Sequence, residues 1–323
     1  MKKLIALLLL VSSFVLCFAA CAPEDDTKLR VGYLTGPTGL GMAKLISDNG
    51  GIDGTSEKYS FKNYADNAVL AQSDLTEGNI DLICVPTNNI AAYYNKTDKD
   101  ITVLSLNALG SLYLVAKDGI EINSIDDLEG KTIYTCQQGT PKLILDALIA
   151  KAGVNATVSY TTPNGTEMDK PNKIAPQVIA GNIDIAVFPE PQVSNALSKR
   201  SDYKVALDLG DVWKDEFGTD LTMGCIVAKK SFVEEHKSLI NKFLKEYKAS
   251  IEFMTDPENL DTAADYVKNA GIIPLEKDVI KNAITNLGDS IAYVDGKDMK
   301  NLLKDFYTAV NINVPDDEFY YEK

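Results

Sequence analysis

The sequence is poor in several residue types, and each shortage excludes a kind of chemistry. It contains one histidine, His236, and two arginines, Arg30 and Arg200, and its 46 Asp+Glu residues outnumber its 32 Lys+Arg residues, for a formal net charge of −14. A single histidine excludes a multi-histidine metal site, and its place in an apolar-faced helical stretch that opens at Ser231 argues against a Ser/Cys–His apparatus. The acidic balance argues against nucleic acid, whose phosphates attract lysine and arginine.

Cysteines are also few, and none of their spacings is typical of a metal site or a disulfide framework. Cys84, Cys136 and Cys225 each lie in an apolar segment, with no C-x-x-C pair among them. We therefore expect them to be small buried hydrophobic residues. No G-x-x-x-x-G-K-[ST] motif occurs, so any ATP hydrolysis would belong to a partner. We expect no catalytic residues, no metal and no cofactor.

The first twenty residues have the features of an export signal. Lys2 and Lys3 precede an apolar run from Leu4 to Leu16, and Phe18-Ala19-Ala20 then precedes Cys21. This arrangement resembles a bacterial lipoprotein signal, in which cleavage before the cysteine is followed by lipidation of its thiol. The resemblance predicts a signal peptide over 1–20, a lipidated Cys21 and a polar tether over 21–28. No other apolar run is long enough to span a membrane.

Two stretches about a hundred residues apart follow the same pattern. Residues 73–90 and 176–193 each run from a helix tail through Gly-Asn-Ile-Asp into an apolar strand and a proline-bearing loop. Gly78 and Gly181 suit helix C-caps, where a left-handed backbone is needed. The apolar strands are typical of a parallel sheet buried on both faces. The repeat predicts two α/β lobes, with the loops after these strands at the carboxyl edges where such sheets bind ligands.

A second repeated pattern indicates how the lobes are connected. Residues 112–117 and 225–230 are apolar strands that both contain Val-Ala-Lys, and a complete α/β set lies between them. We predict that 118–222 form a second lobe inserted into a first lobe made of 29–117 and 223–323. The two Val-Ala-Lys segments would be crossover strands that form a hinge.

Two helix starts in these lobes carry threonine. Thr38 is predicted to N-cap the helix that follows the first strand. Thr140, followed by Pro141, is predicted to N-cap the helix after strand 132–136. Free backbone amides at such helix starts can bind an anion or another polar group.

Taken in order, these motifs resemble the type II substrate-binding proteins of ABC transporters, in the group that binds nitrate, sulfonates, taurine and thiamine-pyrimidine precursors. The resemblance rests on the lipobox, VGYLTGPTGLGMAKL at 31–45, both Gly-Asn-Ile-Asp units, DDLEGKTI at 126–133, Gly139-Thr140 and Glu190-Pro191. It implies an α/β, two-lobed periplasmic-binding-protein fold in which each lobe is a mixed, mostly parallel sheet flanked by helices. It also implies a monomeric receptor, lipid-anchored on the extracytoplasmic face of the cell membrane, that closes on a small organic ligand and delivers it to membrane permease subunits.

The same resemblance places a set of ligand-binding residues in the predicted cleft: Pro37, Thr38, Gly39, Pro86, Thr87, Asn107, Gln138, Gly139, Thr140, Phe188, Glu190 and Thr222. Neither arginine falls in a cleft loop, so a bidentate arginine clamp on a carboxylate is not expected. An anion could instead bind helix-start amides and threonine hydroxyls. A neutral or aromatic ligand could stack on Tyr33, Tyr113 or Phe188.

Two alternatives use the same fold. Biosynthetic enzymes of the thiamine-pyrimidine and menaquinone pathways resemble it, but the former carry a cysteine-rich motif and an active-site histidine that this sequence lacks. The export signal also argues against the role of a cytosolic biosynthetic enzyme. The second alternative is a sensor subunit that presents its ligand to a signalling receptor.

Overall fold

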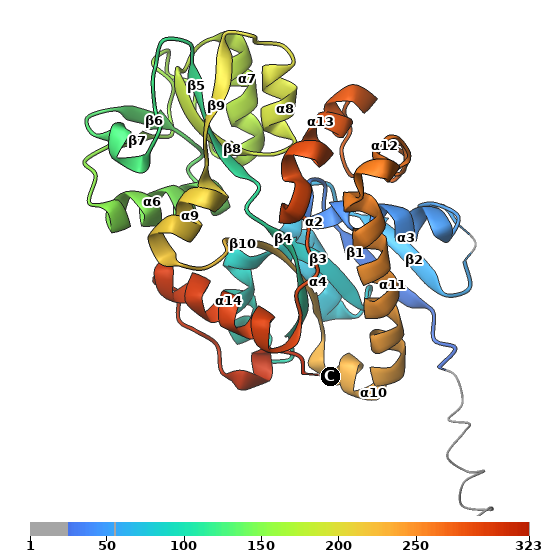
Figure 1. Ribbon diagram of the computed structural model, residues 1–323. Helices are drawn as coiled ribbons and strands as arrows, with labels where there is room; N and C mark the ends of the chain where they lie inside the picture. Colours follow the sequence, from blue (N-terminus) through green and yellow to red (C-terminus); the bar gives the residue numbers. More distant parts are fainter. Residues whose placement is uncertain (1–24, 55, 323) are drawn as a thin grey trace, which may run out of the picture.

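The computed structural model describes residues 25–54 and 56–322. They form two five-stranded sheets that are flanked by helices (Figure 1). The expected signal peptide and Cys21 lie outside the described residues. Within the described part, no helix combines the length and apolar character that a membrane span requires.

The first sheet has the order β2-β1-β3-β10-β4 and the second the order β7-β6-β8-β5-β9. In each sheet the fourth strand is antiparallel to both neighbours, and the other pairs are parallel. The strands are β1 Leu29–Tyr33, β2 Tyr59–Asn63, β3 Leu82–Pro86, β4 Thr102–Leu109, β5 Leu112–Lys117, β6 Thr132–Tyr134, β7 Thr157–Ser159, β8 Ile185–Pro189, β9 Tyr203–Asp208 and β10 Thr222–Ala228.

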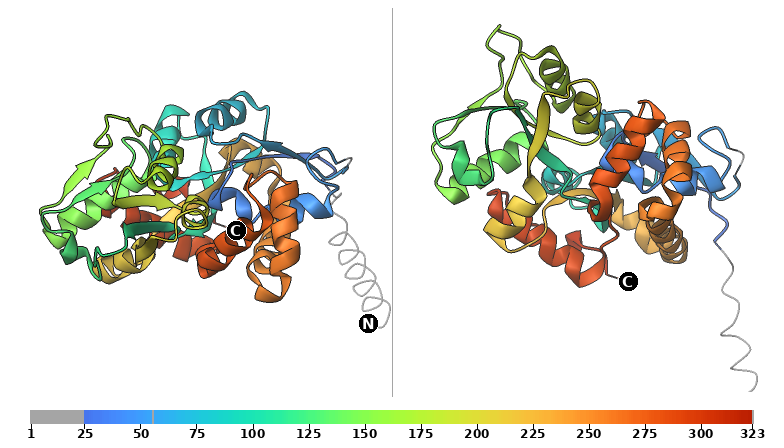
Figure 2. Two further views of the ribbon diagram at one scale, coloured as in Figure 1. Left: turned by 90° about the horizontal axis from the view of Figure 1, so that it is seen from above. Right: turned by 45° about the horizontal axis from the view of Figure 1, so that its top comes forward.

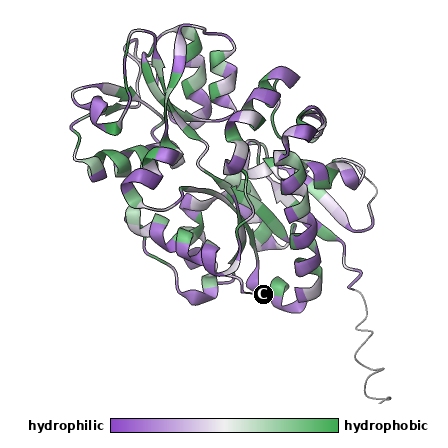
Figure 3. Cartoon of the chain, viewed as in Figure 1, coloured by the Kyte–Doolittle hydropathy of each residue, from purple (hydrophilic) through white to green (hydrophobic). Residues whose placement is uncertain are grey.

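Helices cover both sheets, and the apolar residues gather on the strands and on the helix faces toward them (Figure 3). The helices are α2 Pro37–Leu40, α3 Ala43–Asp48, α4 Ala68–Glu77, α5 Ile90–Lys96, α6 Thr140–Ala152, α7 Ile174–Ala180, α8 Gln192–Leu197, α9 Leu209–Phe217, α10 Lys230–Glu235, α11 Lys237–Thr255, α12 Leu260–Asn269, α13 Lys277–Leu287 and α14 Gly296–Ala309. The right view in Figure 2 shows the green middle of the chain to one side of the blue and orange parts.

The repeated Gly-Asn-Ile-Asp units have the structure that was predicted. Gly78 ends α4 and Gly181 ends α7, both in the left-handed region with φ of 75° and 74°. The strands that follow, β3 and β8, are almost completely buried. Each occupies the third position of its sheet. The two units are therefore equivalent parts of two lobes.

The Val-Ala-Lys strands also occupy equivalent positions, but they do not both belong to the first sheet. β5, which the sequence placed in the first lobe, pairs with β8 and β9 in the second sheet. β10 is the corresponding antiparallel strand of the first sheet. The chain thus leaves the first sheet at Leu109, and only two residues separate that strand from β5. The predicted boundary at 117 falls after β5, which the second sheet holds by hydrogen bonds on both sides.

The chain passes between the sheets twice, and the two passages lie together. The first is Gly110-Ser111, whose φ angles are 51° and 63°. The second runs from β9 through α9 to β10. The amide of Gly110 donates to the carbonyl of Leu221 at 2.9 Å, so the two passages are hydrogen-bonded to each other. This is the position at which a hinge between the lobes would act.

Two helical predictions in the C-terminal part differ from the structure. The helix expected from Ser231 is interrupted at His236, whose φ of −117° and ψ of 35° separate α10 from α11. Ser231 makes no cap and bonds Asp100 instead.

The C-terminal tail after α14 runs beside the edge strand β4. Tyr320 bridges Val103, and the Tyr321 amide donates to the Val103 carbonyl at 3.0 Å. It thereby covers part of an edge that could otherwise pair with another chain.

Trp213 connects the second passage to the C-terminal helices. Its side chain on α9 is fully buried, with its ring 4.3 Å from that of Phe217 and 5.8 Å from that of Phe306 on α14, measured between centroids. We expect Trp213→Ala to lower the free energy of unfolding by about 3–5 kcal/mol, because it leaves a large cavity. Urea unfolding followed by circular dichroism measures this. Val69→Ala is the control, because its side chain is 78% exposed, and it should change the value by at most about 0.5 kcal/mol. Equal values for the two variants would contradict this packing.

Candidate functional site

The topology brings the loops of the candidate site to facing edges of the two sheets. β1, β3 and β4 end at one edge of the first sheet, and β10 begins there. β6, β8 and β9 end at one edge of the second sheet, where β5 begins. Because β4 runs into β5 through only two residues, these two edges meet at the passages. Carboxyl edges are where open α/β sheets position ligands.

The helix start in each lobe has the same unusual geometry. Gly36 precedes α2 with φ 91° and ψ −159°, and Gly139 precedes α6 with φ 101° and ψ −173°. Only glycine adopts this region readily. The prediction that Thr38 and Thr140 are N-caps is therefore wrong, since the cap positions require a backbone that a threonine resists. Each threonine lies within the first turn instead, 8% exposed, and makes no side-chain cap bond.

In the first lobe the predicted polar residues are in contact with one another. The Asn107 amide donates to the Thr38 carbonyl at 2.9 Å, and the Thr87 hydroxyl donates to the Thr222 carbonyl at 3.0 Å. Gly224 permits this arrangement, because a Cβ there would lie 2.6 Å from Asn107 Oδ1 and 2.7 Å from Thr38 Cγ2. Pro37 and Gly39 belong to the same turn α2, and Pro86 ends β3 directly before Thr87.

Three polar atoms near the passages have no hydrogen-bond partner among the described residues. They are Asn107 Oδ1, Thr222 Oγ1 and Ser111 Oγ, and their residues are at most 1% exposed. Buried polar atoms are nearly always hydrogen-bonded, so such atoms suggest a place for water or a ligand. Ser111 was not identified from the sequence, because only its position between β4 and β5 marks it.

In the second lobe the predicted residues divide into a loop and a buried group. Gln138 and Gly139 are exposed in the loop before Thr140. Cys136, at the base of this loop, donates through its thiol to the Gln138 carbonyl at 3.0 Å, and burial raises its pKa to about 11. This thiol is therefore protonated at neutral pH. Glu190 is 1% exposed and accepts from the amide and hydroxyl of Ser194 at 3.0 and 2.9 Å.

The aromatic residues considered for stacking lie in the cores. Phe188 is fully buried and opposite Tyr113 in the second sheet. Tyr33 is also fully buried, and its hydroxyl donates to the Ala270 carbonyl at 2.8 Å. Tyr113 is 5% exposed and donates to the Asn286 carbonyl at 3.0 Å. Asn286 was missed from the sequence, since nothing in its own helix pattern points to the other lobe.

Acidic groups surround this edge of the second sheet, and both arginines are elsewhere. Burial and then the charges of Asp208, Glu190 and Asp211 raise the pKa of Tyr113. Arg30, at the start of β1, is paired with Asp81, and Arg200 with Asp202. Neither arginine therefore lies at the facing edges. Within the described residues there is also no group of three or more His, Cys, Asp or Glu side chains arranged to hold a metal ion.

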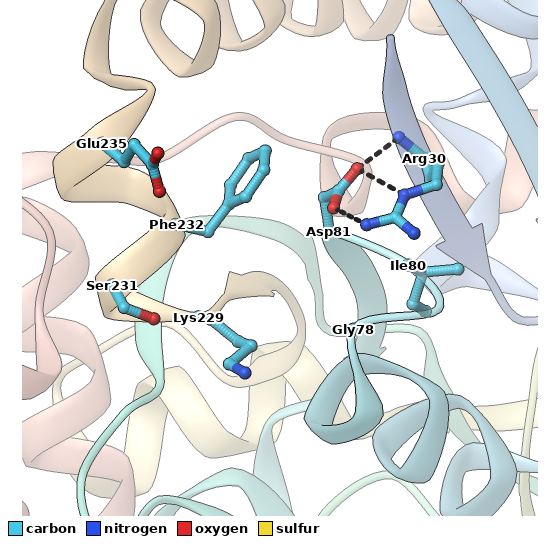
Figure 4. Close-up of a pocket in the computed structure, with 8 residues that line it drawn as sticks. All are labelled: Arg30, Gly78, Ile80, Asp81, Lys229, Ser231, Phe232 and Glu235. Carbon is cyan, nitrogen blue, oxygen red and sulfur yellow. Dashed lines mark hydrogen bonds and ion pairs between the residues drawn. The ribbon is translucent and has the colours of Figure 1, made fainter. Parts of the chain in front are cut away.

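A separate pocket of about 190 Å³ lies at the opposite edge of the first sheet, beside the start of β1 (Figure 4). It is lined by Arg30, Gly78, Ile80, Asp81, Lys229, Ser231, Phe232 and Glu235. None of the predicted ligand residues contributes to it. Arg30 makes two side-chain bonds to Asp81, and Lys229 lies 3.9 Å from Asp100. Because these cations are already paired, we place the candidate site at the facing edges instead.

The fold is that of the two-lobed periplasmic-binding proteins, and comparison with solved structures agrees throughout the chain. An ABC transporter protein from Parabacteroides distasonis is 22% identical with a TM-score of 0.70, over 92% of this chain and 100% of that one. The aliphatic sulphonate-binding protein SsuA from Escherichia coli is 17% identical with a TM-score of 0.69, over 93% of both chains. The nitrate-binding protein NrtA from Synechocystis PCC 6803 is 12% identical with a TM-score of 0.63, over 90% of this chain and 82% of that one.

The family can be stated more closely. The family model described as NMT1/THI5 like matches residues 65–260, which is more than half of the chain. The chain belongs to this family. A search of curated proteins found no match.

Asp208 provides a test of the electrostatics at this edge. Its carboxylate caps α9 by accepting from the Gly210 amide at 2.8 Å, and burial raises its pKa above the ordinary 3.8. A raised carboxyl pKa means that the folded state holds the proton longer than the unfolded state, so stability falls as pH rises from the ordinary to the raised value.

Asp208→Asn keeps an acceptor for the cap and removes the partly buried charge. We expect its melting temperature to exceed that of the wild type at pH 7, with the difference shrinking as pH falls below the ordinary carboxyl pKa. Calorimetry across pH 3–7 measures this. Asp215→Asn, an exposed carboxylate on the same helix, is the control. A rise in melting temperature that is absent at pH 7, or that is larger at low pH, would show that burial of the Asp208 charge does not destabilise the folded state.

Proposed function

We propose that this protein is the extracytoplasmic solute receptor of an ABC importer, which binds a small organic molecule between its lobes by closure at the two passages. The lobes in this proposal are 29–109 with 222–323, and 112–208. The observation that carries it is the pair of helix starts at facing edges. Thr38 and Thr140 lie in the first turns behind Gly36 and Gly139, and no hydrogen bond by either hydroxyl is found among the described residues.

The structural relatives support this role through their names. The Escherichia coli and Synechocystis proteins are named as sulphonate-binding and nitrate-binding, and another relative from Staphylococcus aureus is the ligand-binding component of an ABC-type import system. Proposed partners are therefore the solute and membrane permease subunits. A sensor subunit would use the same solute site and differ only in its partner.

A receptor also fits the chain's chemistry better than a same-fold enzyme. His236 pairs with Asp25 at 2.7 Å at the junction of α10 and α11, away from the facing edges. Cys84 and Cys225 are buried, and burial raises the pKa of both thiols, that of Cys84 to about 12. These groups are poorly suited to act on a bound molecule. We infer that the solute leaves the protein chemically unchanged.

Two measurements together can identify the solute. Native mass spectrometry would show a bound molecule, and thermal shift against sulfonates, pyrimidines, vitamins and aromatic acids would rank candidates, since binding raises the melting temperature. Recovery of the intact molecule after incubation supports a receptor. A chemically altered product would support the enzyme instead.

Two isosteric substitutions test the proposed contacts. Thr38→Val and Thr140→Val each remove one hydroxyl and keep the side-chain volume. Each should raise the dissociation constant by about three- to tenfold, the value of one neutral hydrogen bond. Thr308→Val on α14, whose hydroxyl bonds the Lys304 carbonyl, should leave it unchanged. Titration calorimetry measures all three. Unchanged binding in both site variants would place the solute elsewhere.

The proposed lipid anchor at Cys21 has its own test. In cells given a fatty-acid analogue, the wild-type protein should carry the label and partition with membranes, because lipidation of a thiol supplies the anchor. Cys21→Ser should remove the label and release the protein. Cys17→Ser, which lies within the expected signal segment, should retain both properties. A labelled Cys21→Ser protein would refute the assignment.

A further inference from the structure

Asn286 makes polar contacts from the C-terminal helices to the second lobe. It lies near the end of α13, which packs against α12 on one side and against α8 of the second lobe on the other (Figure 1). Its side-chain amide donates to Glu190 Oε1 at 2.8 Å and approaches Ser194 Oγ at 3.2 Å. Its carbonyl accepts from the Tyr113 hydroxyl at 3.0 Å. One residue thus joins the C-terminal helices to two elements of the other lobe.

Glu190 makes this contact stronger than an ordinary polar one. The residue is 1% exposed, and its other bonds come from Ser194 within the same lobe. No lysine or arginine pairs with it among the described residues, so the side chain of Asn286 is its donor from the other lobe. Hydrogen bonds to an ionised acceptor are about twice as strong as neutral ones. Another polar contact between the lobes, Asn172 to Asp66 at 3.2 Å, joins two exposed side chains. Asn286 is exposed as well, but its acceptor Glu190 is buried, so the Asn172 contact should count for less.

Of the predicted solute-binding residues, only Glu190 takes part in this contact. Glu190 was expected to touch the ligand, but three hydrogen bonds occupy its carboxylate, and Thr38, Thr140 and Asn107 take no part in them. A contact of this kind favours the closed arrangement whether or not a solute is present. Closure stabilised in advance raises apparent affinity, because less binding energy is needed to populate the competent state.

We propose that Asn286 is a latch that sets the equilibrium between open and closed lobes by donating to the buried Glu190 carboxylate. The role in solute affinity rests on the proposed receptor function, whereas the effect on lobe closure does not. Replacement of the amide by a second carboxylate should reverse the contact from attraction to repulsion, at nearly constant size.

The test is a measurement of lobe separation in the protein without added solute. Small-angle scattering gives the radius of gyration. A spin-label pair introduced by Val69→Cys and Lys173→Cys, on opposite lobes, gives a distance distribution, and the described native cysteines are all buried. Asn286→Asp should increase both the radius and the label distance. Asn282→Asp, an exposed residue one turn earlier on α13, adds the same charge and should leave both unchanged.

A compensating variant separates the latch from a general loss of structure. In Asn286→Asp combined with Glu190→Gln, donor and acceptor are exchanged, so the double variant should return to the wild-type separation. Asn286→Asp with the wild-type separation, or equal opening by Asn282→Asp, would overturn the proposal. If a solute is known, Asn286→Asp should also raise its dissociation constant about five- to tenfold, within the usual range of conformational coupling. Opening without any detectable solute would support the latch and count against the receptor.

Discussion

The two-residue passage Gly110-Ser111 determines how the rest of the molecule is arranged. β4 reaches the edge of the first sheet at Leu109, and β5 starts at the edge of the second sheet at Leu112. With so short a connection the second sheet must present that edge toward the first. All loops that follow the parallel strands of either sheet then lie in the region between the lobes. The Gly110–Leu221 hydrogen bond brings the return passage to the same place.

The two lobes share the same strand arrangement and the same kinds of helix end and helix start. Each places an antiparallel strand fourth in its sheet, ends a helix with a left-handed glycine before its third strand, and opens a helix with a glycine at φ near 90–100°. Because glycine has no side chain, it offers no acceptor to the first-turn amides, and those donors stay without a side-chain cap. Polar groups that local structure does not use remain for another partner.

The sequence was sufficient for features that depend on local pattern. The left-handed caps at Gly78 and Gly181, the buried strands behind them and the two-lobed fold all follow from short-range rules of periodicity and capping. Prediction from the sequence failed where contacts between residues far apart in the chain decide the structure. Leu112–Lys117 looks the same in either sheet, so only hydrogen bonds to β8 and β9 decide its lobe. Thr38 and Thr140 were predicted to be caps because the sequence does not reveal the backbone angles of Gly36 and Gly139, which occupy the cap positions. Asn286 could not be found at all, because its partners are about a hundred residues away or more.

Trp213 is the only tryptophan in the chain, and it lies on α9 within the return passage, packed against Phe306. An indole ring changes its light emission when its surroundings change. Any rotation of one lobe against the other must be accommodated next to this ring, whose indole nitrogen has no partner among the described residues. Trp213 is therefore a natural optical probe for the proposed closure, which could be followed in real time without attaching a dye.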